Sequence, residues 1–204
     1  MERLLEQHPL RHGAHPTRGD GMCAMEMVAW LAGEPHSDEP RCACPVIAAF
    51  VRALNDALPS DAARNRLLRP LVPKLVNTRA NGRVEALRAR LAADAGIREL
   101  LPLLLERQRR HEEAALLRRL PPLEGDESID AAVRALDHYA RDQHAMRWVL
   151  LRATDGTPPA RYVAGVMQVV RRMGDAKAWQ LAVDLIDRLV AVAPNTTAAA
   201  EGVC

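Results

Sequence analysis

Residues 20–58 read DGMCAMEMVAWLAGEPHSDEPRCACPVIAAFVRALNDAL, and this stretch decides the fold. It contains two strongly apolar segments, 22–32 and 45–58, which are separated by a short polar loop. A helix that is apolar on nearly all sides belongs in a protein interior. The stretch therefore predicts two buried helices joined by a tight connection.

Residues that favour helix ends bound both apolar segments. Asp20 can cap a first helix over 21–32, and Gly33 followed by Pro35 ends it. Pro45 suits the first position of the second helix, because the missing proline N–H is not needed there. Serine and aspartate in the intervening loop can bond nearby backbone N–H groups, so we expect a rigid connection.

Similar signals predict helices through the rest of the chain. Apolar residues recur at helical spacing after each signal, whereas no segment alternates with a period of two between turns. The predicted fold class is all-α, a compact multi-helix bundle of six to eight helices without a sheet. Further helices are expected to begin near Ser60, Asn81, Ser128 (a long helix over 128–153), Pro159 and Gly174–Asp175, with Pro102 as a break.

The domain organisation is predicted from composition along the chain. Residues 1–19 mix prolines, glycines and three histidines without periodicity, and we expect a flexible N-terminal arm. Residues 20–204 are expected to form a single helical domain, with a looser join near 121–127, where two prolines form the clearest linker.

Composition excludes several classes of protein. The chain has 204 residues, 49% hydrophobic and 26% charged, with a formal net charge of +2. This balance lacks the basic stripe that nucleic-acid binding requires, so nucleic acid is an unlikely partner. No apolar run is long enough for a membrane span and no secretory signal is readable, so we expect a cytoplasmic protein with reduced cysteines.

Glu26 lies in the middle of the first apolar helix. An ionised carboxylate that is buried without a partner is very costly. We expect a buried polar pair between Glu26 and Arg52, or a hydrogen bond from Glu26 to the loop. Exposure to solvent and a role as a ligand or general acid–base are the alternatives.

Four residues that zinc accepts as ligands occur close together, and they are Cys23, His36, Cys42 and Cys44. Three thiolates and an imidazole would complete a tetrahedral zinc site. However, paired Cys-x-x-Cys knuckles are absent, and a cysteine in an apolar helix usually packs as a small hydrophobe. No cofactor is therefore expected, and zinc and a redox-active thiol pair are the alternatives.

The sequence shows no pattern typical of a catalytic site. No serine stands in a nucleophile-elbow sequence, and His111-Glu-Glu lacks the second histidine of a zinc-protease helix. The sequence therefore predicts no catalytic residue and favours a protein that is not an enzyme.

Several segments form a recognisable pattern, which is GMCxMExxAxLAGEPxSDxPxC, followed by PVIAAF and then ND. These segments cover residues 21–26, 31–42, 45–50 and 55–56, and residues 71–79 belong to the same pattern. This pattern resembles an uncharacterised family of hypothetical proteins from actinobacteria, related bacteria and phages. The resemblance implies a bacterial or phage protein, and it implies no activity, cofactor or site residue. The family commonly has a small polar residue where Cys44 stands, which weakens a three-thiolate zinc site.

These patterns favour a non-catalytic helical module for protein interaction or scaffolding, with a homo-oligomer as an expected assembly. The candidate interaction loop consists of Glu34, His36, Ser37, Asp38, Glu39 and Arg41. The alternative is a protein that binds zinc or iron, or depends on a thiol, and is centred on Cys23, Glu26, His36 and Cys42.

Overall fold

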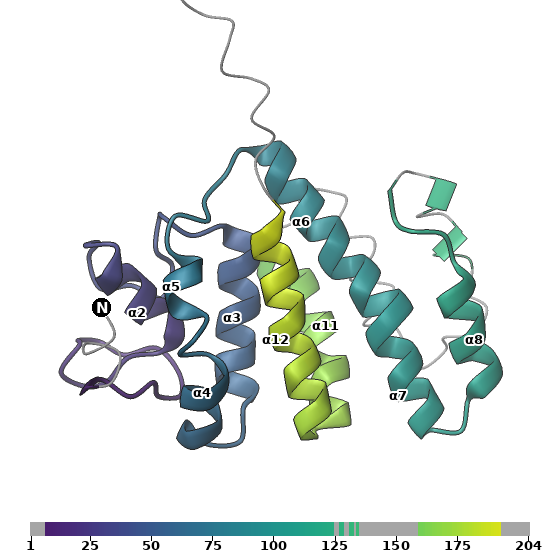
Figure 1. The fold of residues 1–204 in the computed structure, drawn as a ribbon, viewed down its shortest axis with the longest axis horizontal. Helices are drawn as coiled ribbons and strands as arrows, with labels where there is room; N and C mark the ends of the chain where they lie inside the picture. The colour runs from purple at the N-terminus through teal and green to yellow at the C-terminus, as the bar shows by residue number, and fades with distance from the viewer. Residues whose placement is uncertain (1–6, 125–126, 129–130, 133, 135–158, 193–204) are drawn as a thin grey trace, which may run out of the picture.

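The structure is a computed structural model, and it describes residues 7–124, 127–128, 131–132, 134 and 159–192. These residues are mainly helical and contain no strand, which confirms the all-α prediction (Figure 1). Leu10 and Met22 form one isolated parallel bridge. No described helix has both the length and the hydropathy to cross a membrane.

Several of the described helices begin close to the predicted positions. In chain order they are α2 (Ala24–Leu31), α3 (Pro45–Ala57), α4 (Asp61–Leu67), α5 (Val72–Leu75), α6 (Gly82–Asp94), the π-helical segment η1 (Ala95–Leu100), α7 (Leu101–Arg107), α8 (His111–Arg119), α11 (Pro159–Met173) and α12 (Ala176–Ala191). Pro102 does not break the chain of helices as predicted, because it lies in the first turn of α7, directly after η1. The predicted helix over 128–153 lies outside the described residues, apart from 128, 131–132 and 134.

The start of α2 differs from the prediction. Its N-cap is Cys23, whose Sγ accepts a hydrogen bond from the Glu26 N–H at 3.4 Å. The Glu26 carboxylate in turn accepts the Cys23 N–H at 2.7 Å, which completes a capping box. Asp20 is not the cap, because its carboxylate accepts a hydrogen bond from Thr17 Oγ1 at 2.7 Å instead.

The end of α2 follows the prediction. Gly33 has a φ of +72°, the left-handed conformation that glycine adopts most readily. The Gly33 N–H donates to the Trp30 carbonyl at 3.1 Å, and the Glu34 N–H donates to the Ala29 carbonyl at 2.9 Å. These two bonds form a Schellman motif, which turns the chain sharply into the following loop.

Helix α3 lies at the centre of the described core. It packs most extensively against α11 and also contacts α2, α6 and α12, so helices from both ends of the chain share one core. Phe50 and Leu54 of α3 are fully buried. The predicted apolar stripe of α11 is confirmed at Val163, Val166 and Val170, which are also buried.

Arg88 joins α6 to the end of α12. Its side chain is only 3% exposed. The guanidinium donates to the carbonyls of Thr78 at 2.6 Å, Leu189 at 2.9 Å and Val192 at 3.0 Å. Arginine therefore satisfies carbonyls at the C-terminal end of α12 that have no partner within the helix.

Residues 7–19, which the sequence predicts to belong to a flexible arm, are mostly exposed but are joined to the helices at several points. Leu10 is fully buried. Its N–H donates to Asn65 Oδ1 at 2.8 Å, and its carbonyl accepts from Asn65 Nδ2 at 3.0 Å. Asn55 Nδ2 donates to the Arg11 carbonyl at 3.0 Å. Two asparagine side chains thus satisfy an irregular backbone that has no helix or sheet of its own.

Candidate functional site

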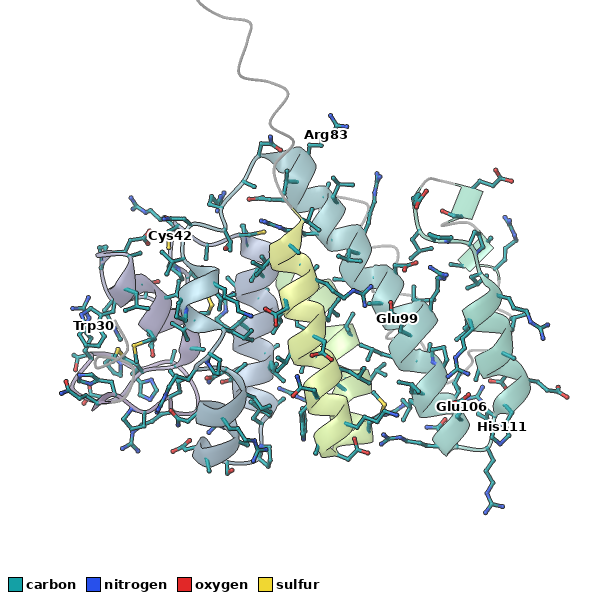
Figure 2. The ribbon with its side chains drawn as sticks, viewed as in Figure 1. Trp30, Cys42, Arg83, Glu99, Glu106 and His111 are labelled. Carbon is teal, nitrogen blue, oxygen red and sulfur yellow. The ribbon has the colours of Figure 1, made fainter. Side chains whose placement is uncertain are left out.

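The candidate site surrounds the buried carboxylate of Glu26, at the end of the molecule that carries Trp30 and Cys42 in Figure 2. Glu26 is 1% exposed. Its Oε1 accepts the His15 N–H at 2.6 Å, and its Oε2 accepts the Cys23 N–H at 2.7 Å and contacts His15 Nδ1 at 2.9 Å. His36 Nε2 lies 3.4 Å from Oε1. Residues from the N-terminal segment, α2 and the following loop therefore converge on one carboxylate.

The hydrogen bonds keep this carboxylate ionised. Burial alone would raise the pKa of Glu26, but the N–H groups of His15 and Cys23 and the His15 imidazole outweigh it and lower the pKa below its usual value. An ionised carboxylate can only accept hydrogen bonds, so His15 Nδ1 must carry a hydrogen. His36 Nε2 is 2.9 Å from the His15 carbonyl and must likewise carry a hydrogen. His36 Nδ1 is buried and has no hydrogen-bond partner among the described residues.

The predicted pair between Glu26 and Arg52 is not formed. Arg52 Nη1 donates to the Asp38 carbonyl at 2.9 Å, and Nη2 pairs with the Glu39 carboxylate at 2.9 Å. The backbone and imidazole donors that approach Glu26 already use its oxygens. Arg52 instead holds the middle of the loop.

The predicted interaction loop is anchored at several points. The Glu34 carboxylate accepts the Arg41 N–H at 2.6 Å and the Cys42 N–H at 2.8 Å, so one side chain joins both ends of the loop. Ser37 Oγ accepts the Glu39 N–H at 3.0 Å. Glu39, in contrast, keeps a side chain that is 73% exposed.

The structure describes three cysteines, of which two have a thiol with a raised pKa and the third is buried. Burial raises the pKa of the Cys23 thiol to about 12, and the negative charge of Glu26 acts in the same direction. The pKa of Cys42 is raised too, by burial and by the charge of Glu34. Cys44 is buried at the start of α3, where its N–H donates to Thr78 Oγ1 at 3.1 Å.

The predicted zinc ligands are not brought together. Within the part of the chain that the structure describes, no group of three or more His, Cys, Asp or Glu side chains is arranged to hold a metal ion. Cys23 and His36 both lie near Glu26, whereas Cys42 and Cys44 follow the other end of the loop.

Sequence reasoning missed His15, because nothing in an irregular segment indicates which side chain turns inward. It also missed a cluster on Trp30. The His8 ring packs edge-on against Trp30 with centroids 4.8 Å apart, and the Arg18 guanidinium lies 5.5 Å from the Trp30 centroid. Asn55 did offer a signal, since it is one of three polar residues, with Arg52 and Asp56, on an otherwise apolar helix.

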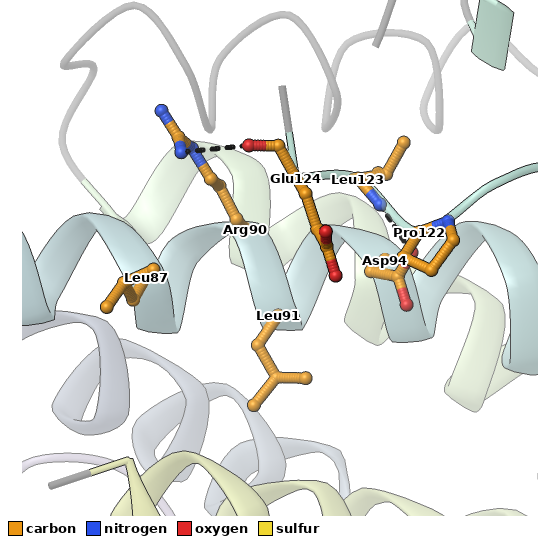
Figure 3. Close-up of a pocket in the computed structure, with 7 residues that line it drawn as sticks. All are labelled: Leu87, Arg90, Leu91, Asp94, Pro122, Leu123 and Glu124. Carbon is orange, nitrogen blue, oxygen red and sulfur yellow. Dashed lines mark hydrogen bonds between the residues drawn. The ribbon is translucent and has the colours of Figure 1, made fainter. Parts of the chain in front are cut away.

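A mainly apolar hollow of about 230 Å³ lies along α6, away from the Glu26 site (Figure 3). Leu87 and Leu91 line it, and Leu87 is 43% exposed. The Leu123 N–H donates to Asp94 Oδ1 at 3.1 Å across its edge. Residues 125 and 126 follow this edge directly and lie outside the described residues, so we assign it no ligand.

Comparisons of the chain with protein-family models, with curated proteins and with solved structures give no match. The resemblance noted from the sequence therefore stays a prediction. Function has to be argued from the site itself.

Proposed function

We propose that this protein is a helical recognition module that binds a partner protein, or a second copy of itself, through the interaction loop. The loop comprises residues 34–41. The observation that carries the proposal is the double anchor of Glu34, whose carboxylate binds the N–H groups of both Arg41 and Cys42. A loop that is already ordered loses less conformational entropy when it binds, so its affinity is higher.

The anchoring residues and the exposed residues of the loop are different. Glu34 and His36 direct their polar groups to the protein itself, and Arg52 holds the Asp38 carbonyl. Glu39 and Arg41 remain exposed. Binding residues are often found on loops that a rigid scaffold positions in this way.

The thiol alternative has weaker support. A thiolate is the reactive form of cysteine, and a pKa of about 12 leaves almost none of it on Cys23 at neutral pH. The metal alternative lacks a ligand group among the described residues. A recognition role requires neither.

Site-specific photo-crosslinking tests the proposal. A photoreactive residue would replace Glu39 in the loop, and a control would replace Arg83, which is exposed in the first turn of α6 and is not part of the loop (Figure 2). In cells that naturally produce the protein, we expect a discrete adduct from position 39 and none from position 83. The mass of the adduct distinguishes a second copy from another protein.

A variant of the anchor strengthens the test. Glu34→Gln removes one of the two carboxylate acceptors but leaves Glu39 and Arg41 unchanged, so we expect a several-fold lower adduct yield from position 39. Equal adducts from positions 39 and 83, or no adduct from position 39, would refute the proposal.

A further inference from the structure

A polar hollow of about 170 Å³ lies between two stretches of the N-terminal segment, residues 8–11 and 18–22. His8, Arg11, Arg18 and Asp20 are the charged or titratable residues among those that line it. A single water needs only about 10–15 Å³ of such space. The hollow therefore has room for a ligand of several heavy atoms, and it shares no residue with the interaction loop.

The charges in the hollow favour an anion. Among the described residues, neither Arg11 nor Arg18 forms an ion pair. The Arg18 guanidinium lies over Trp30 and donates to the Glu34 carbonyl at 3.3 Å, and neither contact neutralises its charge. Among the described residues that line the hollow, Asp20 alone carries a carboxylate. Two arginines against one carboxylate leave the hollow positively charged.

The backbone and the neighbouring side chains hold the two arginines at the hollow. The Arg11 N–H donates to the Met22 carbonyl at 2.9 Å, which joins the two stretches. Gly21 has a φ of +134°, and a Cβ there would lie 2.8 Å from Arg11 Cδ and 2.9 Å from the His15 ring. A side chain at residue 21 would therefore force the Arg11 stem or the His15 ring to move.

We propose that this hollow binds a phosphate-class oxyanion, held by Arg11 and Arg18. Guanidinium groups match the oxygens of such anions in geometry and charge. Asp20 Oδ2 accepts from Thr17 Oγ1, while Oδ1 has no donor within the described residues. Hydrogen phosphate can donate its proton to that oxygen. Sulfate carries no proton at neutral pH, so it should bind more weakly.

Titration of the isotope-labelled full-length protein with inorganic phosphate tests the site, with the amide signals of Gly19 and Gly21 as reporters. We expect Arg11→Gln and Arg18→Gln each to weaken phosphate binding at least about tenfold, the usual effect of losing a charge-assisted hydrogen bond. Arg66→Gln is the matched control, because Arg66 is exposed on α4 outside the hollow, and it should leave the affinity unchanged.

The outcomes separate the proposal from its rivals. No shift of the two glycine signals at millimolar phosphate, or equal affinity in the arginine variants, overturns the site. Sulfate that binds as tightly as phosphate overturns the role of Asp20. Glycerol 3-phosphate is the second probe: tighter binding than inorganic phosphate indicates a phosphate monoester as the natural ligand, and equal binding indicates free phosphate. Unchanged thermal melting shows that the variants remain folded.

Discussion

Glu26→Gln is expected to destabilise the protein, although glutamine has nearly the size and shape of glutamate. All the polar groups that approach Glu26 are donors: the N–H groups of His15 and Cys23, His15 Nδ1 and His36 Nε2. The amide nitrogen of glutamine is itself a donor. Whether the amide nitrogen takes the place of Oε1 or of Oε2, it faces the backbone N–H of His15 or of Cys23, and that N–H then has no acceptor.

The size of the effect follows from these contacts. Each hydrogen bond to a charged group contributes about 1.5–3 kcal/mol, and a buried N–H without an acceptor adds its desolvation cost. His15 can shift its hydrogen to Nε2 and accept from the new amide, so one bond is partly recovered. We therefore expect a loss of about 3–5 kcal/mol, out of the roughly 5–15 kcal/mol that stabilises a typical domain. For a chain of this size that lowers Tm by about 10 °C.

Urea unfolding at pH 7, followed by circular dichroism, measures this loss. Glu39→Gln is the control, because Glu39 is 73% exposed and its replacement should change stability by less than about 0.5 kcal/mol. If Glu26→Gln costs less than about 1 kcal/mol, the hydrogen bonds at this carboxylate do not stabilise the fold as argued here.

Four further results are expected. The pKa of Glu26 is lower in the folded state than in the unfolded state, so the ionised carboxylate stabilises the fold above the unfolded pKa of about 4.3, and this stabilisation is lost as the pH falls through the folded pKa. The melting temperatures of wild type and Glu26→Gln should therefore converge in acid. A difference in melting temperature that stays constant with pH would contradict this. Iodoacetamide at pH 8 should modify Cys42 well before Cys23 in the folded protein, as peptide mass spectrometry can show, and equal rates contradict the raised pKa of Cys23. Arg88→Leu should cost about 2–4 kcal/mol in urea unfolding, because buried carbonyls lose their donor, and amide exchange should speed up near the end of α12. Gly33→Ala should cost about 1–2 kcal/mol from backbone strain alone, since no atom lies within 4 Å of the added Cβ, and an unchanged Tm would contradict it.

The starts of several helices in the described part of the chain could be predicted, because a few adjacent residues decide each one. Pro45 begins α3, and the side chains of Ser60, Asn81 and Asp175 cap α4, α6 and α12. Each cap is a bond between a side chain and a backbone N–H two or three residues away. The start of α2 was missed because cysteine is a weak acceptor that sequence rules do not count among helix caps.

The site could be predicted only in part. The apolar sequence around Glu26 favoured a buried carboxylate with a partner over an exposed one, but it did not indicate which donor would be that partner. Arg52 was chosen for its charge, and the structure places it against Asp38 and Glu39 instead. The actual partner is His15, which comes from a segment without any periodic pattern.

The sequence alone determined that the described part of this protein is helical, where several of its helices begin, and that a carboxylate lies in the middle of an apolar helix. These features depend on interactions within one or two helical turns, which residue order specifies directly. Only the tertiary structure decided which groups bind that carboxylate. His15 reaches Glu26 because Asn55 and Asn65, more than 40 residues further along the chain, fix the path of residues 10 and 11. A buried polar group takes whichever donors the folded chain brings to it, and that choice depends on packing between distant segments.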